Sequence, residues 1–129
     1  MNIGINKVIL IGNVGASAEL RHTEAGVPVT NFNLATNYQA RGEDQVEWHK
    51  IVVWNALAEL CAKYLEKGLR VYVEGHLHTK KYEDRDGNYQ YVTEIVAHQV
   101  TFLGSTRRVE ETTTQEVIQE EEEQLNSVF

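Results

Sequence analysis

Residues 47–68, EWHKIVVWNALAELCAKYLEKG, decide the fold of this chain. Their first part, up to Trp54, is rich in β-branched and aromatic residues and predicts a strand. Beyond it the apolar residues recur at helical spacing; they are Leu57, Leu60, Cys61, Tyr64 and Leu65. Asn55 is a suitable N-cap and Gly68 a suitable C′ residue for such a helix. The stretch therefore predicts a strand that leads directly into one helix.

Four further segments predict strands, two before this stretch and two after it. They are residues 6–12, 27–38, 69–82 and 89–103. Residues 24–26 and 41–44 separate the first three strands, and Asp86-Gly87 is typical of a hairpin turn between the last two. Five strands with a helix between the third and fourth are the order of the OB-fold, an all-β, five-stranded Greek-key barrel. Small SH3-like barrels and some mixed domains give similar orders.

Charge divides the chain into two parts. All 12 Lys and Arg precede residue 109, where 12 acidic residues accompany them, and seven glutamates without a base follow. We expect one folded domain over residues 1–104 and a disordered acidic tail over residues 105–129. The net charge of −7 therefore lies beyond residue 108, and the neutral remainder of the chain can still present a basic face to a polyanion.

Other features of composition bound the class of protein. The one cysteine, Cys61, excludes an internal disulfide framework and favours a reducing compartment. The first 12 residues lack the features of a secretory signal, and no stretch approaches the roughly 20 apolar residues of a membrane span. We expect a cytoplasmic protein.

Alternation along residues 48–54 places two tryptophans on one side of the third strand. Trp48, Lys50, Val52 and Trp54 share a side, and His49, Ile51 and Val53 form a plausible core side. Two indoles with a cation suit a polyanion that carries flat bases, since one stacked base is worth about 1–3 kcal/mol. The alternative is that one tryptophan simply caps the barrel.

The predicted hairpin carries a second group of aromatic and basic residues. Tyr82 shares a side with Lys80, and Lys81 faces away from it. Such a hairpin can stack bases and neutralise phosphates, although lysines also protect ordinary edge strands from aggregation. Lys7, Arg21 and Tyr38 are further candidates, as phosphate contacts or, for Tyr38, as another stacking platform.

Catalytic and metal-binding patterns are not apparent. The chain has no phosphate-binding glycine loop, no nucleophile elbow and no singled-out pair of acids. His76, His78 and His98 do not have the spacing of a structural zinc site, and the cysteine lies within the predicted helix. We expect neither an enzyme nor a bound metal or other cofactor.

Seven blocks in succession resemble the bacterial single-stranded DNA-binding protein family. They are residues 6–15, 32–37, 47–50, 57–59, 64–68, 71–75 and 91–96. They occur in family-like order and spacing over about residues 3–104. The resemblance implies an OB-fold and a homotetramer around which single-stranded DNA wraps.

The resemblance also implies roles for individual residues. Trp48 and Tyr82 match stacking tryptophans, Trp54 matches a stacking phenylalanine, and His49 matches a histidine at the subunit contact. Lys50, Lys80 and Lys81 match basic positions along the DNA path. Residues 39–45 form a short loop in this alignment, and Ala40 stands where many members have a further aromatic residue.

The tail resembles the tip through which the family recruits replication and repair proteins. The matching residues are Glu120, Glu121, Glu122, Glu123 and Phe129, while Val128 replaces the usual proline. We expect sequence-independent binding and protection of single-stranded DNA in replication, recombination and repair, by a nucleoid-associated protein. The alternative is a primosome-type OB-fold adaptor that bridges replication proteins. A nuclease is disfavoured because clustered acids for metal ions are missing.

Overall fold

The computed structural model describes residues 2–16 and 18–105. Within these residues the chain forms six strands and one helix. They are β1 (Val8–Val14), β2 (Glu19–His22), β3 (Pro28–Ala40), β4 (Glu43–Trp54), α1 (Asn55–Tyr64), β5 (Leu69–Glu83) and β6 (Tyr89–Ser105). The predicted tail lies outside the described residues, except for Ser105 at the end of β6.

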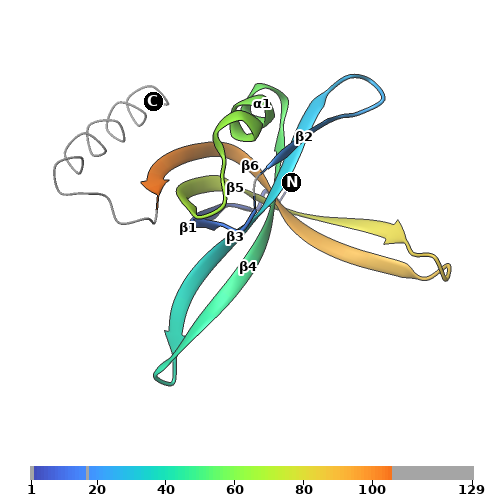
Figure 1. Cartoon of the computed structure of the whole chain (residues 1–129). Helices are drawn as coiled ribbons and strands as arrows, with labels where there is room; N and C mark the ends of the chain where they lie inside the picture. Colours follow the sequence, from blue (N-terminus) through green and yellow to red (C-terminus); the bar gives the residue numbers. More distant parts are fainter. Residues whose placement is uncertain (1, 17, 106–129) are drawn as a thin grey trace.

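The strands form one sheet that closes on itself. Their order is β1-β5-β6-β4-β3-β2, and β1 also pairs with β3 through Asn13–Ala35 and Val14–Leu34. β4 and β6 run parallel, and the other neighbours are antiparallel. This is the predicted OB-fold, with β2 as an additional short strand. The β3–β4 and β5–β6 hairpins extend beyond the barrel as two arms that point in different directions (Figure 1).

Alternating apolar side chains fill the barrel. Ile51 and Val53 of β4 are fully buried together with Val71 and Val73 of β5. The helix contributes Ala58 and Cys61 to the same cluster, and Leu65 follows directly. Burying one such large aliphatic side chain stabilises the fold by about 1.5–3 kcal/mol. Because successive side chains alternate between the two sides of a strand, the residues between these buried ones face outward and are not needed for the core.

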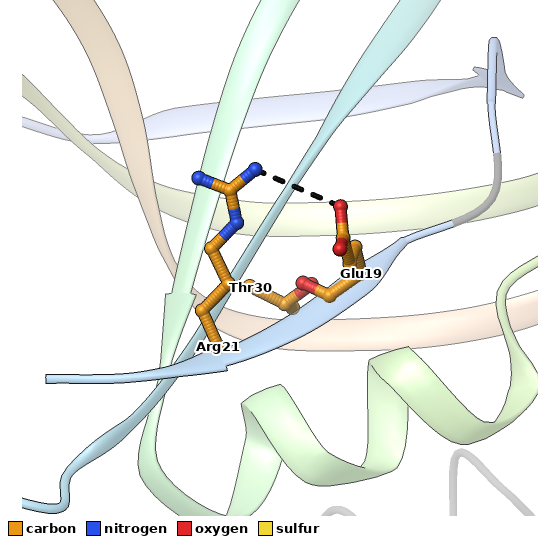
Figure 2. A network of polar contacts seen from close by, with 3 residues as sticks. All are labelled: Glu19, Arg21 and Thr30. Carbon is orange, nitrogen blue, oxygen red and sulfur yellow. Dashed lines mark hydrogen bonds and ion pairs between the residues drawn. The ribbon is translucent and has the colours of Figure 1, made fainter.

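The strand β2 is absent from the sequence-based prediction. Residues 24–26 therefore separate β2 from β3, and not the first two strands of the barrel. All four residues of β2 are exposed, so no apolar alternation marks it in the sequence. The strand is held by pairing with β3 and by the Thr30 hydroxyl, which donates a hydrogen bond of 2.6 Å to the Glu19 carbonyl (Figure 2).

Both predicted ends of the helix are wrong. Trp54 is the N-cap residue without a side-chain capping bond, while Asn55 has φ 63° and makes the sharp turn from β4 into the helix. Asparagine tolerates this left-handed conformation better than most residues. The helix ends at Tyr64 with Leu65 as C-cap. Gly68 lies four residues after Tyr64 and directly before β5, and its N–H donates a hydrogen bond to the Val14 carbonyl.

The segment 39–45 is part of an arm rather than a loop. β3 continues to Ala40, which pairs with Glu43 at the start of β4. Only Arg41 and Gly42 lie between, with φ 53° and 78°. Two successive positive φ angles are the requirement of a type I′ turn, which suits the twist of a hairpin. The sequence-based boundaries failed here because polar residues on a two-stranded arm show no buried side.

Candidate nucleic-acid interface

The outer side of β4 carries both tryptophans. Trp48 and Trp54 are 59% and 40% exposed, whereas Ile51 and Val53 on the other side are fully buried. The predicted alternation is therefore present. Val52 lies between the tryptophans on the outer side and is nevertheless buried. The two indoles are thus separate exposed surfaces, with the buried apolar side chain of Val52 between them.

Pairing with β6 and β5 extends this outer side across the sheet. Val52 is the parallel partner of Val96, so residues of β6 in step with Val96 face the same way. Lys80 is paired with Val92 of this row, and Tyr82 with Gln90. Partners across a strand pair share a side. We call the combined surface the aromatic face; its aromatic and basic residues are Trp48, Lys50, Trp54, Lys80 and Tyr82.

Lys81 lies on the opposite side of the β5–β6 arm. Its partner in the sheet is Tyr91, and its ammonium group lies 3.9 Å from the centroid of the Tyr89 ring. Both tyrosines are exposed. The structure therefore does not bring Lys81 to the aromatic face, and the arm has a second side with its own aromatic and basic residues.

Gly15 makes room for the indole of Trp48. A Cβ atom on Gly15 would lie 2.5 Å from Trp48 Cζ3 and 3.0 Å from Cη2, both too close for unchanged positions. The Gly15 N–H donates to the Asn33 carbonyl at 2.8 Å, which fixes this backbone beside β3. The sequence analysis missed Gly15 because its neighbour is 33 positions away in the chain.

Arg21 of β2 lies in line with Trp54. Arg21 pairs with Val29, and Val29 pairs with Trp54, so the three side chains form one row on the outer side. The guanidinium lies 3.6 Å from the Glu19 carboxylate, on the same side of β2 (Figure 2), and both side chains are largely exposed. Arg21 therefore extends the basic edge of the aromatic face beyond β3.

Lys7 and Tyr38 lie elsewhere. Lys7 precedes β1, and its ammonium group contacts Glu74 of β5 at 2.5 Å. A hydrogen bond to Glu74, together with its charge, raises the pKa of Lys7. Tyr38 is paired with Gln45, which places it on the opposite side of the β3–β4 arm from Trp48. Neither residue joins the aromatic face.

His49 also lies opposite the tryptophans. It is half-buried, and its Nε2 lies 2.9 Å from the Thr36 hydroxyl oxygen. The imidazole is therefore held against β3 at the base of the β3–β4 arm. Nothing in this geometry directs it toward the aromatic face.

Glu94 is a residue of the aromatic face that the sequence analysis missed. It is the sheet partner of His78, on the row of β6 that includes Val92 and Val96. Its carboxylate lies 3.9 Å from Lys50 and 3.6 Å from Lys80, although Glu94 itself is only 5% exposed. Sequence reasoning could not find it because the two lysines come from different strands.

Groups that could support catalysis or bind a metal ion were also located. Burial raises the pKa of the Cys61 thiol to about 12, so it is not a reactive thiolate. His76 Nδ1 and His98 Nε2 are 2.6 Å apart and form a hydrogen-bonded pair. Residues 2–16 and 18–105 contain no group of three or more metal-ligating side chains. The helix in this part of the chain is too short and polar to span a membrane.

The tail candidates Glu120, Glu121, Glu122, Glu123 and Phe129 lie outside the described residues. Within the described residues, the aromatic face is formed by the barrel and its arms. Its chemistry is that of exposed aromatic rings beside ammonium groups, which can stack flat bases and attract phosphates.

Comparisons with known proteins identify relatives over the folded part. A model of the single-strand binding protein family matches residues 5–103. The single-stranded DNA-binding protein 1 of Chlorobaculum tepidum is 43% identical over 108 residues, which are 79% of this chain and 67% of the relative. The single-stranded DNA-binding protein of Xanthomonas campestris is 42% identical over 106 residues, covering 78% of this chain and 62% of the relative. The chain thus matches roughly two thirds of each relative's length.

A solved structure of an SSB is also similar to this chain, in fold and in sequence. The Plasmodium falciparum SSB in complex with ssDNA superposes with a TM-score of 0.72 and 38% sequence identity. The match covers 80% of this chain and 99% of the other. The likeness therefore includes nearly the whole of that chain and four fifths of this one.

Proposed function

Since this chain belongs to the single-strand binding protein family, we propose that it binds single-stranded DNA without regard to base sequence. It acts by binding and not by catalysis. The observation that carries the proposal is the aromatic face, where Trp48, Trp54 and Tyr82 are exposed beside lysines from two strands. Three exposed aromatic rings beside ammonium groups on one side form a surface on which flat bases can stack.

Stacking supplies the part of the affinity that is tolerant of sequence. Every base has a π-face, and one stacked base contributes about 1–3 kcal/mol. Trp48 and Trp54 are six residues apart on β4, which corresponds to about 20 Å along a strand. The two indoles therefore stack different bases of the same DNA strand, and Tyr82 on the other arm takes a third.

Phosphate contacts supply the part of the affinity that depends on salt. Lys50 and Lys80 lie on the aromatic face, and Arg21 lies in line with Trp54 at its edge. For single strands the logarithm of affinity falls with the logarithm of salt with a slope of about −0.7 for each phosphate neutralised. Lys81 contributes from the other side of its arm, and Lys7 acts only after release from Glu74.

We further propose that the chain assembles as a homotetramer. Ile9 and Ile11 of β1 are 56% and 46% exposed on the outer side of the barrel. Within the described residues, β1 pairs with β3 only at Asn13 and Val14, which leaves the earlier part of that edge open. An open edge with exposed apolar side chains favours pairing with another copy. His49 contributes to the subunit contacts.

The remaining proposals concern the cell. The protein protects single-stranded DNA during replication, recombination and repair, in the cytoplasm and in association with the nucleoid. Residues 105–129 recruit partner proteins through their acidic run and Phe129. The distribution of charge supports separate roles for the two parts of the chain, because all lysines and arginines precede the final 21 residues.

A titration with oligo-dT tests DNA binding. Tryptophan fluorescence is expected to be strongly quenched, with affinity that falls as salt is raised. Trp48→Ala, Trp54→Ala and Tyr82→Ala should each weaken binding by about 1–3 kcal/mol, as measured by anisotropy of labelled dT. Tyr38→Ala is the matched control, because it removes an aromatic ring from the opposite side of the β3–β4 arm.

Two outcomes would contradict the proposal. Absence of quenching at low salt would exclude stacking on the tryptophans. Equal losses for Tyr38→Ala and the three variants of the aromatic face would mean that this face is not the binding surface. Light scattering on the same samples measures the subunit number, and a monomeric mass would exclude the homotetramer.

A further inference from the structure

Glu94 occupies an unexpected position for an acidic residue. It lies on β6, the strand between β4 and β5, in the middle of the aromatic face. Lys50 approaches from β4 and Lys80 from β5, on either side of the carboxylate. A negative charge there opposes the attraction of this face for phosphates. The proposed function does not account for it.

The contacts of Glu94 are not those of a strong structural ion pair. The Lys50 and Lys80 distances of 3.9 and 3.6 Å exceed the 2.7–2.9 Å usual for charge-assisted hydrogen bonds. The Oε2 atom is buried and has no hydrogen-bond partner in the described part of the chain. A buried charge usually requires close hydrogen bonds to offset its lost hydration. The arrangement is therefore held by charge attraction and not by close hydrogen bonds.

The two lysines remain accessible while they neutralise Glu94. Their side chains are 43% and 51% exposed, against 6% for the glutamate side chain. A phosphate arriving from solvent can thus reach both ammonium groups, whereas Glu94 stays beneath them. His78, the sheet partner of Glu94, is a further titratable side chain beside it. The carboxylate and an incoming phosphate compete for the same two cations.

We propose that Glu94 is an internal counter-anion for Lys50 and Lys80 that positions both lysines on the aromatic face and limits its affinity for DNA. Glu94 is a positioning residue, because it acts through the lysines and does not touch the strand. The inference rests on the proposed function, since it assumes that the aromatic face binds phosphates. Its consequence is a face that holds its cations in place yet releases the strand more readily.

The test is the variant Glu94→Gln, which keeps the side-chain shape and removes the charge. Its dT affinity at 50 mM salt is expected to rise by about fivefold, the effect of one unit charge at about 4 Å in water. The slope of affinity against salt should steepen by about 0.7, as for one more phosphate neutralised. Glu59→Gln on α1 is the control for net charge, because it removes the same charge from an exposed helix position.

A second set of variants separates competition from a purely structural role. If Glu94 competes for Lys80, then Lys80→Met should weaken binding more in the Glu94→Gln background than in the wild type. If Glu94→Gln does not fold, Glu94→Met serves instead, since it also removes the charge and the two lysine side chains, 43% and 51% exposed, remain in contact with solvent. Circular dichroism monitors folding of each variant.

The outcomes distinguish this inference from the proposed function. No binding of dT by the wild type would contradict the proposed function itself. Normal wild-type binding with unchanged or weaker affinity and an unchanged salt slope in folded Glu94→Gln would overturn the role of Glu94 alone. A gain in affinity equal to that of Glu59→Gln would likewise overturn it, because the effect would then come from net charge.

Discussion

Because Gly15 has no side chain, the indole of Trp48 can pack directly against the backbone at this position. The tryptophan ring lies where a side chain at position 15 would begin, and the Gly15 amide is bound to β3. A stacking platform needs a fixed orientation, because each freely rotating side chain loses entropy on binding. Gly15 is therefore expected to support the proposed binding surface without touching the ligand.

We predict that Gly15→Ala weakens binding of dT by up to about 1–3 kcal/mol, the contribution of one stacked base. The new Cβ, at 2.5 Å from Cζ3, forces the indole away from its position. The measurement is a dT titration followed by the amplitude of fluorescence quenching. Gly4→Ala is the control, since a Cβ there meets no atom within 4 Å. Equal affinity and quenching for both variants would mean that Gly15 does not set the platform.

The β5–β6 arm carries Tyr82 and depends on the turn at its tip. The Asp84 carboxylate accepts hydrogen bonds from the Asp86 and Asn88 amides and from the Gln90 side chain. These bonds, with that from Gln90 the largest contribution, lower the pKa of Asp84. The turn is thus stabilised by the ionised form of the carboxyl group. The stabilisation is complete above the ordinary carboxyl pKa of about 3.9 and is lost as pH falls through the lower pKa of the folded state.

We predict that Asp84→Ala loosens the tip of the arm and leaves the barrel intact. Amide exchange should become faster at Asp86 and Asn88, whose donors lose their acceptor. The loss of dT affinity should not exceed that of Tyr82→Ala. Asp86→Ala removes the same charge from the same turn and keeps the three bonds to Asp84. Faster exchange throughout β1 and β4 would instead indicate that the arm is required by the barrel.

At the scale of the whole molecule, residues 109–129 and the aromatic face are expected to have opposite electrostatic effects on DNA. The net charge of −7 arises entirely beyond the last basic residue, Arg108. A nearby anionic segment repels a polyanion and competes for the same cations. In this respect residues 109–129 are expected to oppose DNA binding, as Glu94 is proposed to do within the aromatic face.

We predict that deleting residues 120–129 leaves dT affinity equal or higher, because four glutamates are removed. The gain should disappear at high salt, where exposed charges are screened. Replacing Glu120, Glu121, Glu122 and Glu123 by glutamine is the matched variant, since it keeps the length of the segment. A marked loss of affinity on deletion would show that the segment supports DNA binding directly.

Much of the aromatic face could be predicted, because the alternation of side chains between the two sides of a strand can be read within one segment of the sequence. Alternation along β4 assigns Trp48 and Trp54 to one side, and the same period separates Tyr82 from Lys81. The order of strands and helix indicated the OB-fold, because each of these elements has an apolar pattern within its own segment. The short strand β2 and the N-cap at Trp54 were not predictable, because neither depends on an apolar pattern within its own segment.

The sequence by itself determined which residues share a side of each strand, since side-chain direction follows from a period of two along the chain. Only the tertiary structure decided which strands lie next to one another. It aligned Arg21 with Trp54, placed Gly15 beneath Trp48 and enclosed Glu94 between Lys50 and Lys80. These contacts join residues far apart in the chain. They depend on strand order and pairing register, which the closing of the whole barrel determines.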